Sequence, residues 1–198
     1  VADREPTVVI DFTGPESAVE YAETCADAGV AYVTGTTGFD EDGLEALEAA
    51  SEDVPVLHAP NFARGVQALV NIVGEAVQNL PGYDVELVET HHNGKRDAPS
   101  GTANRLLEEI EANGDFGERT HGREGDAPRE ASEIGVHALR AGDITGEHEI
   151  ILAGNHEEVR LTHRAEDRGV FAAGAVDAAV WIAGQKAGSY DFADVIAE

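Results

Sequence analysis

The chain has 198 residues, of which 42% are hydrophobic, so it is long enough to bury one substantial core or two small ones. Its 39 acidic and 13 basic residues give a formal charge of -26, which disfavours binding to nucleic acid or to an anionic membrane and resembles proteins of a high-salt cytoplasm. Cys25 is the single cysteine and no hydrophobic run approaches the roughly 20 residues of a membrane span, so we expect a cytoplasmic protein without disulfides.

Strand and helix patterns alternate at the start of the chain. We predict strands at residues 7–11, 30–34 and 54–58, separated by helices at 15–28 and 40–51. This alternation predicts a parallel sheet with crossover helices, and ligands bind at the carboxyl ends of the strands in such a sheet.

Two loops at those carboxyl ends are candidates for cofactor contacts. Gly35-Thr36-Thr37-Gly38 follows the second predicted strand, and Ala59-Pro60-Asn61-Phe62 follows the third. The first loop is an ordinary tight turn unless a nucleotide lies along the sheet edge. In the second, Asn61 and Phe62 could hold a flat ring, although a turn Asn and a buried Phe are the commoner explanation of such a pair.

The rest of the chain follows a different pattern. We predict a helix at 67–79, a strand at 84–91, a helix at 101–113 and an irregular loop at 114–132. Strands at 134–138, 147–153 and 159–164 have short connections, which imply antiparallel pairing, and a helix at 170–182 precedes a short tail at 190–196. The pattern predicts an α/β domain and an α+β domain with a mixed or antiparallel sheet, with the active site between them.

The segment from Glu89 to Thr102 combines several residues that can bind a ligand or transfer a proton. Its sequence is E-T-H-H-N-G-K-R-D-A-P-S-G-T. Its two histidines leave the end of a predicted strand, and Ser100-Gly101-Thr102 opens a predicted helix. Lys95 supplies a positive charge and the first helical amides supply N–H groups, so a carboxylate or phosphate can bind here. Because an imidazole exchanges protons near neutral pH, the segment predicts an anion-binding site for proton transfer.

Simpler interpretations of this segment stay open. His91 and His92 could be one packed and one solvated polar residue, and Ser100 or Thr102 could be an ordinary helix cap. Neighbouring strand side chains point to opposite faces, so the two histidines are not expected to share a metal ion. The other six histidines show no compact ligand spacing, and we predict no metal site.

Six segments in chain order resemble the 4-hydroxy-tetrahydrodipicolinate reductases, formerly called dihydrodipicolinate reductases. They are V-I-D-F-T-G-P-E, V-T-G-T-T-G-F, A-P-N-F-A-R-G-V, E-T-H-H-N-G-K-R-D-A-P-S-G-T-A, L-R-A-G-D-I-T-G-E-H and L-T-H-R-A-E-D-R-G-V-F-A-A-G-A, between about Val8 and Ile196. The resemblance implies an enzyme that reduces the cyclic product of aspartate semialdehyde and pyruvate with NADPH or NADH. The product, tetrahydrodipicolinate, lies on the diaminopimelate route to lysine.

The resemblance also implies domains and residue roles. Residues 1–62 and 169–198 would form a Rossmann-type dinucleotide-binding domain, and residues 63–168 a substrate-binding domain that assembles a homotetramer through its mixed, largely antiparallel sheet. His91 would be the proton donor or acceptor and Lys95 the second proton donor, while His92, Gly101 and Thr102 would bind a small dicarboxylate substrate. Cofactor contacts are implied for Gly35, Thr36, Thr37, Ala59, Pro60, Asn61 and Phe62.

One departure from the family pattern concerns the start of the chain. Family members begin with a strand and a G-x-x-G-x-x-G phosphate loop, and neither precedes Val8. We therefore expect a dinucleotide-binding domain without its first strands, and weak or no cofactor binding by this chain. Two alternatives remain: a related nicotinamide-dependent reductase of another small acid, and a non-catalytic remnant without the phosphate loop.

Overall fold

The computed structural model describes residues 6–197, which fall into two compact units. Unit 1 combines the residues up to Arg64 with those from Gly169 onward, and unit 2 is Gly65–Arg168. Within residues 6–197, no helix combines the length and the apolar character needed to cross a membrane. The expectation about a phosphate loop concerns the chain ahead of Val8, where residues 1–5 lie outside the described range.

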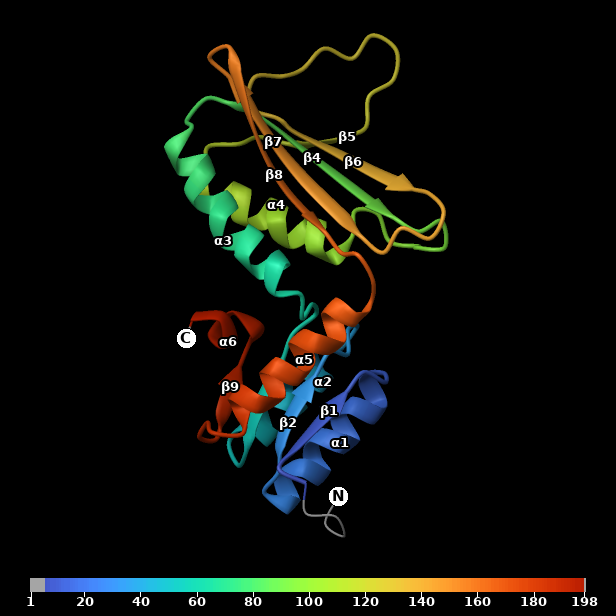
Figure 1. Cartoon of the computed structure of the whole chain (residues 1–198), viewed down its shortest axis with the longest axis vertical. Coiled ribbons are helices and arrows are strands. Elements are labelled where there is room, and N and C mark those ends of the chain that lie inside the picture. Colours follow the sequence, from blue (N-terminus) through green and yellow to red (C-terminus); the bar gives the residue numbers. More distant parts are fainter. Residues whose placement is uncertain (1–5, 198) are drawn as a thin grey trace. The chain divides into compact units, whose positions relative to one another are not determined.

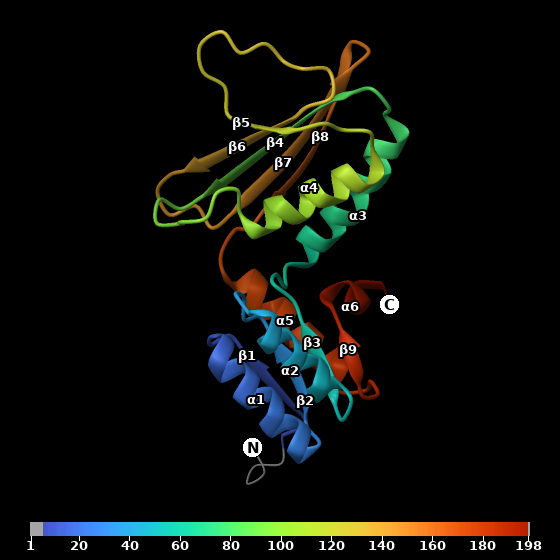
Figure 2. The same cartoon turned by 180° about the vertical axis from the view of Figure 1, so that it is seen from behind.

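Unit 1 is a four-stranded parallel sheet with helices on both faces (Figures 1 and 2). The strand order is β1-β2-β3-β9. The strands are β1 (Val8–Asp11), β2 (Ala31–Thr34), β3 (Pro55–His58) and β9 (Gly188–Tyr190), and the helices are α1 (Pro15–Ala28), α2 (Glu41–Ser51), α5 (Gly169–Ile182) and α6 (Phe192–Ala197). The predicted parallel sheet with crossover helices is confirmed. The expected tail at 190–196 instead belongs to a fourth strand and a short helix.

Alternation along the strands explains the two covered faces of this sheet. In β2, Ala31 and Val33 pack in one cluster with α5 and α6, while Tyr32 packs on the other face with α1 and α2. The Tyr32 hydroxyl donates a hydrogen bond of 3.0 Å to the carbonyl of Ala18 in α1. Because successive strand side chains point to opposite faces, an apolar run without polar alternation gives a strand that is buried on both sides.

Unit 2 is a five-stranded sheet with one face covered by two helices (Figures 1 and 2). The strand order is β5-β6-β4-β7-β8. The elements are α3 (Arg64–Asn79), β4 (Asp84–His91), α4 (Gly101–Asn113), β5 (Arg119–His121), β6 (Ile134–Arg140), β7 (Glu147–Gly154) and β8 (Glu157–Arg164). The predicted mixed sheet is confirmed: β6 runs parallel to β4 and β5, and β7 runs antiparallel to β4 and β8.

Two details of unit 2 correct the predictions. The loop expected at 114–132 contains β5, whose three residues are too few to show a period. Antiparallel pairing holds for β7 and β8 but not for β6, because β4 lies between β6 and β7. Residues 141–146 connect β6 to β7, and a segment of that length can cross the roughly 10 Å that two strand spacings require.

The core of unit 2 continues into a polar cluster at one end of the sheet. Alternate residues of the three central strands face α3 and α4, namely Val85 and Leu87 of β4, Ile134 and Val136 of β6, and Ile150 and Leu152 of β7. The same alternation brings Glu89 and His91 of β4, Arg140 of β6 and His148 of β7 to that face. The start of α4 caps this end of the core, so the fold holds polar groups against the first turn of a helix.

Candidate active site

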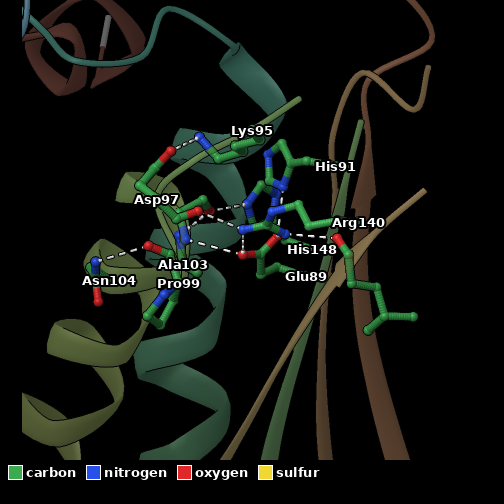
Figure 3. A network of polar contacts seen from close by, with 11 residues as sticks. Glu89, His91, Lys95, Asp97, Pro99, Ala103, Asn104, Arg140 and His148 are labelled. Atoms are coloured by element: carbon green, nitrogen blue, oxygen red, sulfur yellow. Dashed lines mark hydrogen bonds and ion pairs between the residues drawn. The ribbon is translucent and has the colours of Figure 1, made fainter. Parts of the chain in front are cut away.

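Glu89 is the centre of the buried polar cluster (Figure 3). Its carboxylate is fully buried and accepts two hydrogen bonds from Arg140, at 2.7 and 2.8 Å, and one from the backbone N–H of Ser100 at 3.1 Å. Burial raises the pKa of Glu89, but the hydrogen bonds from Arg140 and His91 outweigh it, so that this pKa lies below its usual value. The side chain is therefore a carboxylate at neutral pH.

His91 lies two residues after Glu89 on the same face of β4, and its Nδ1 atom is 2.6 Å from the Glu89 carboxylate. An ionised carboxylate only accepts hydrogen bonds, so we assign the proton to Nδ1 and leave Nε2 for proton exchange. Burial lowers the pKa of His91, and Lys95 and Arg140 lower it further, whereas Glu89 raises it. The net pKa lies below the ordinary value of 6.5, so the neutral imidazole is the favoured form at neutral pH.

Lys95 lies in a tight turn that follows His91. Its backbone N–H donates to the His92 carbonyl at 3.1 Å, and its Nζ atom lies 2.8 Å from a carboxylate oxygen of Asp97. The ammonium holds the pKa of Asp97 below its usual range and lowers that of His91 through space. His92 is half-buried in the same turn. The predicted proton donor Lys95 therefore lies near enough to His91 to influence its charge.

The first turn of α4 follows this loop and carries the predicted substrate residues Gly101 and Thr102. Ser100 is the N-cap residue, and its hydroxyl accepts the N–H of Ala103 at 3.1 Å, which confirms the helix-cap interpretation. Gly101 is exposed at the first helical position, and a Cβ atom added there would meet nothing within 4 Å. Thr102 follows, half-buried, in the same first turn. The first turn therefore opens onto accessible space, where its N–H groups and helix dipole favour an anion.

Sequence reasoning gave no role to three members of the cluster, Glu89, Arg140 and His148. The Nε2 atom of His148 lies 3.0 Å from the Ser100 hydroxyl, and its ring packs edge-on against that of His91 with 5.2 Å between ring centres. The alternation of β4 alone places Glu89 on the face of His91. Arg140 and His148 both lie in the quoted segment L-R-A-G-D-I-T-G-E-H, but only the strand register reveals their neighbours.

The charged and histidine-rich cluster does not have the arrangement of a metal site. Among residues 6–197, no group of three or more His, Cys, Asp or Glu side chains is placed to hold a metal ion.

In unit 1, Asp11 organises the carboxyl edge of the sheet. Its buried carboxylate accepts hydrogen bonds from the hydroxyls of Thr13, Thr34 and Thr36 at 2.7, 3.0 and 2.9 Å. Burial raises the pKa of Asp11, but these hydrogen bonds outweigh it and keep the pKa below its usual value. Thr36 is therefore anchored to β1 and β2, whereas Thr37 beside it is exposed.

The loops after β2 and β3 lie side by side at this edge. The Ala59 N–H donates to the Thr34 carbonyl at 3.1 Å, and His58 Nε2 lies 3.0 Å from the Thr36 carbonyl. These contacts bring together the two predicted cofactor segments, Gly35 to Thr37 and Ala59 to Phe62.

Side chains in these loops differ in what they can offer a ligand. Phe62 is buried against Phe12, with ring centres 5.5 Å apart, and Asn61 accepts the Ala63 N–H at 2.8 Å. Pro60 is exposed. Gly35 lies directly against the ring of Phe12, which is 52% exposed. The edge therefore offers an accessible aromatic ring beside the exposed residues Thr37 and Pro60.

Comparisons with known proteins point to the same family over nearly the whole chain. The model for the N-terminus of dihydrodipicolinate reductase matches residues 1–62, and the model for its C-terminus matches residues 65–196. A 4-hydroxy-tetrahydrodipicolinate reductase of Natronomonas pharaonis is 60% identical over 95% of this chain and 77% of its own length, and one of Haloarcula marismortui is 58% identical over 96% and 76%. A dipicolinate-bound dihydrodipicolinate reductase of Paenisporosarcina sp. TG-14 has a TM-score of 0.77 at 27% identity, over 94% of this chain and 72% of that one.

Proposed function

Because this chain belongs to the dihydrodipicolinate reductase family, we propose that the cluster around Glu89 and His91, with the first turn of α4, is its substrate site. The reaction is the reduction of 4-hydroxy-tetrahydrodipicolinate to tetrahydrodipicolinate by NADH or NADPH, in the synthesis of lysine by way of diaminopimelate. The observation that carries this function is identity of up to 60% to reductases of that name over nearly the whole chain.

The chemistry requires both a hydride and a proton. The substrate gains one of each and releases one molecule of water, since its 4-hydroxyl group is absent from the product. When bound, the reduced nicotinamide supplies the hydride. Addition of hydride to a conjugated imine leaves an electron pair that must take up a proton. We assign this proton to Nε2 of His91, with Lys95 as the second proton donor.

We assign the carboxylates of the substrate to the first turn of α4. The N–H groups of Gly101 and Thr102 would hold one carboxylate, with His92 as a further contact. Support comes from the open space beside Gly101 and from the Ser100 cap, which holds the first turn in place. A dicarboxylate approaching a protein of charge -26 needs such a local positive site.

The carboxyl edge of the unit 1 sheet fits the nicotinamide half of the cofactor. The ring of Phe12 is 52% exposed and lies over the backbone of Gly35, so it gives this edge an accessible apolar face. We propose that Gly35 to Thr37 and Ala59 to Phe62 hold this part of the cofactor. Asp11 would keep the first of these loops in shape through its contact with Thr36.

We propose that residues 1–62 and 169–198 form the dinucleotide-binding domain, and that residues 63–168 bind the substrate and assemble a cytoplasmic homotetramer. The sheet face opposite α3 and α4 supports the second role, because no helix of unit 2 covers it (Figure 2). By strand alternation Leu139 of β6 belongs to this face, and it is 47% exposed.

The test is the oxidation of NADPH or NADH, followed by absorbance, with substrate generated from aspartate semialdehyde and pyruvate. We expect His91→Gln and Lys95→Ala to lower kcat by about 10²-fold or more while the circular dichroism spectrum is kept. Lys186→Ala is the matched control, because Lys186 is the other lysine of the chain and is exposed in unit 1. Unchanged turnover in both site variants would remove the proposed roles.

A further inference from the structure

We propose that Glu89 is a positioning residue for proton transfer at His91, fixing which ring nitrogen carries the exchangeable proton, and that Arg140 holds Glu89 in place for this task. The inference deepens the proposed function and rests on the role given there to His91. Figure 3 shows Glu89 with His91 of β4 and Arg140 of β6. The backbone N–H of Ser100, at the start of α4, is the third group at this carboxylate.

Both oxygens of Glu89 have two partners each. Oε2 lies 2.6 Å from His91 Nδ1 and 2.8 Å from Arg140 Nη1, while Oε1 accepts from Arg140 Nη2 at 2.7 Å and from the Ser100 N–H at 3.1 Å. Paired hydrogen bonds between a guanidinium and a carboxylate fix the orientation of both planes. The carboxylate therefore cannot rotate away from His91 without breaking several charge-assisted hydrogen bonds.

Arg140 is itself held from the other side. Its guanidinium also donates to the backbone carbonyls of Leu139 at 2.7 Å and Asp97 at 2.6 Å. The second contact reaches into the loop that carries Lys95. Arg140 thus joins the end of β6 to both the buried carboxylate and the loop between β4 and α4.

This arrangement controls the tautomer of His91. A carboxylate cannot donate a hydrogen bond, so the proton stays on Nδ1 whether the ring is neutral or charged. Neutral His91 then presents an Nε2 lone pair, and charged His91 presents Nε2–H. In the transfer step Nε2–H gives its proton to the substrate, the electrons of that N–H bond remain on Nε2, and solvent restores the proton.

Other charged or titratable groups around His91 do not replace Glu89. Lys95 in the following turn and Arg140 on β6 are cations that disfavour a charged ring. His148 on β7 packs edge-on against the ring and stays neutral because it is buried. Glu89 is therefore the group that favours the charged form of His91 against these neighbours and against burial.

The decisive variant is Glu89→Gln, which keeps the size of the side chain. Its amide can still accept the Ser100 N–H through oxygen, while its NH₂ group faces His91 Nδ1 as a donor. We expect the neutral ring to move its proton to Nε2, which histidine-selective ¹⁵N NMR measures directly from the shifts of the two ring nitrogens. The His91→Gln spectrum identifies the signals, and Glu89→Asp, which keeps the charge, should keep the Nδ1–H tautomer.

Activity gives the second readout. We expect Glu89→Gln to lower kcat by at least about tenfold with a smaller change in KM, and to move the loss of activity at rising pH to lower pH. If Glu89→Gln does not fold, Arg140→Lys removes the paired hydrogen bonds but keeps the charge, and should shift the His91 tautomer in the same direction.

The outcomes separate this inference from the proposed function. An unchanged His91 tautomer and pH profile in a folded Glu89→Gln protein would overturn the positioning role, even if its stability fell. Full activity of His91→Gln would instead overturn the role of His91 in the proposed function, while the NMR result would still report on Glu89. A tautomer change together with a shifted pH profile supports the inference.

Discussion

The hydroxyl of Ser100 and the Nε2 atom of His148 lie 3.0 Å apart, although 48 positions separate the two residues in the sequence. The hydroxyl already accepts the N–H of Ala103 at the helix start, so its own proton can be donated to His148. Within the described chain, His148 Nδ1 is buried without a hydrogen-bond partner. A strand histidine and a helix cap are therefore joined inside the core, where a charge is unfavourable.

The burial of His148 predicts that the protein loses stability in acid. Burial lowers its pKa from 6.5 to about 3, so the folded protein keeps this ring neutral while the unfolded chain protonates it below about pH 6.5. Stability from this group is present above that pH and is lost as the pH falls toward 3. When the pH is lowered from about 7 to about 5, we expect the free energy of unfolding of the parent protein to fall by about 2 kcal/mol more than that of His148→Gln.

Urea unfolding at the two pH values measures this difference. His121→Gln is the matched control, because it makes the same replacement at an exposed histidine of the same unit, on β5. Equal pH dependence in the parent and His148→Gln would show that His148 is not the group responsible.

A methyl group at position 101 should weaken substrate binding and leave the fold intact. A Cβ atom there would meet nothing within 4 Å, and alanine is favoured over glycine in a helix, so stability should stay the same or rise slightly. If the first turn of α4 binds a substrate carboxylate, Gly101→Ala should raise KM for the substrate by at least about tenfold, worth about 1.4 kcal/mol.

Steady-state kinetics and thermal unfolding of the same preparations check this prediction. Glu108→Ala, an exposed change in the same helix, controls for effects on α4 as a whole. An unchanged KM in Gly101→Ala would place the carboxylates elsewhere.

The sequence predicts the bounds of two helices, one in each unit, for identifiable reasons. Pro15 at the first turn and Gly29 with a φ of 66° bound α1, and the Ser100 cap begins α4, so the helices at 15–28 and 101–113 have the predicted bounds. The strands β5 and β9 were not predicted, because each has three residues and pairs only at a sheet edge. Short edge strands depend on their neighbours rather than on a local pattern.

The candidate site likewise has a part that the sequence predicts and a part that it does not. His91, Lys95 and the helix start are close in sequence, so their residue types were enough to suggest proton transfer beside an anion. Arg140 and His148 join them through pairing across β6 and β7, and the insertion of β4 between those strands was not predicted. The pairing that brings the distant members of the cluster together was therefore the part that the sequence could not supply.

Gly174 allows α5 to pack closely against the loop after β3, for which we propose a cofactor contact. A Cβ atom added at Gly174 would overlap the carbonyl oxygen of Phe62 and lie 3.1 Å from Cζ of Phe192. Because the first obstacle is backbone, Gly174→Ala must move α5 or the loop after β3. We expect a loss of about 1–3 kcal/mol in the free energy of unfolding and a higher KM for the cofactor.

Denaturant unfolding measures the free energy of unfolding. The reaction rate at a series of cofactor concentrations gives the KM for the cofactor. At Gly184 the nearest atom to an added Cβ is 3.8 Å away, so Gly184→Ala should change neither quantity appreciably. A folded Gly174→Ala protein with parental stability would show that this contact relaxes easily.

Helix α2 offers a direct test of how the acidic surface responds to salt. Glu41 lies in its first turn, where the helix dipole favours a negative charge, while Glu48 lies in its last turns, where the dipole opposes one; both are exposed. In low salt, Glu41→Gln should lower the free energy of unfolding and Glu48→Gln should raise it, each by about 0.3–1 kcal/mol. Relief of repulsion in a chain of charge -26 adds to the gain at Glu48 and reduces the loss at Glu41.

At about 1 M KCl the screening length falls to about 3 Å, so the difference between the two variants should shrink toward zero while the parent protein becomes more stable. Thermal unfolding of the three proteins across a series of KCl concentrations measures both trends. A difference that persists at high salt would assign it to helix propensity or local contacts instead of charge. A parent protein that loses stability as KCl rises would contradict the view that repulsion among its acidic residues limits folding.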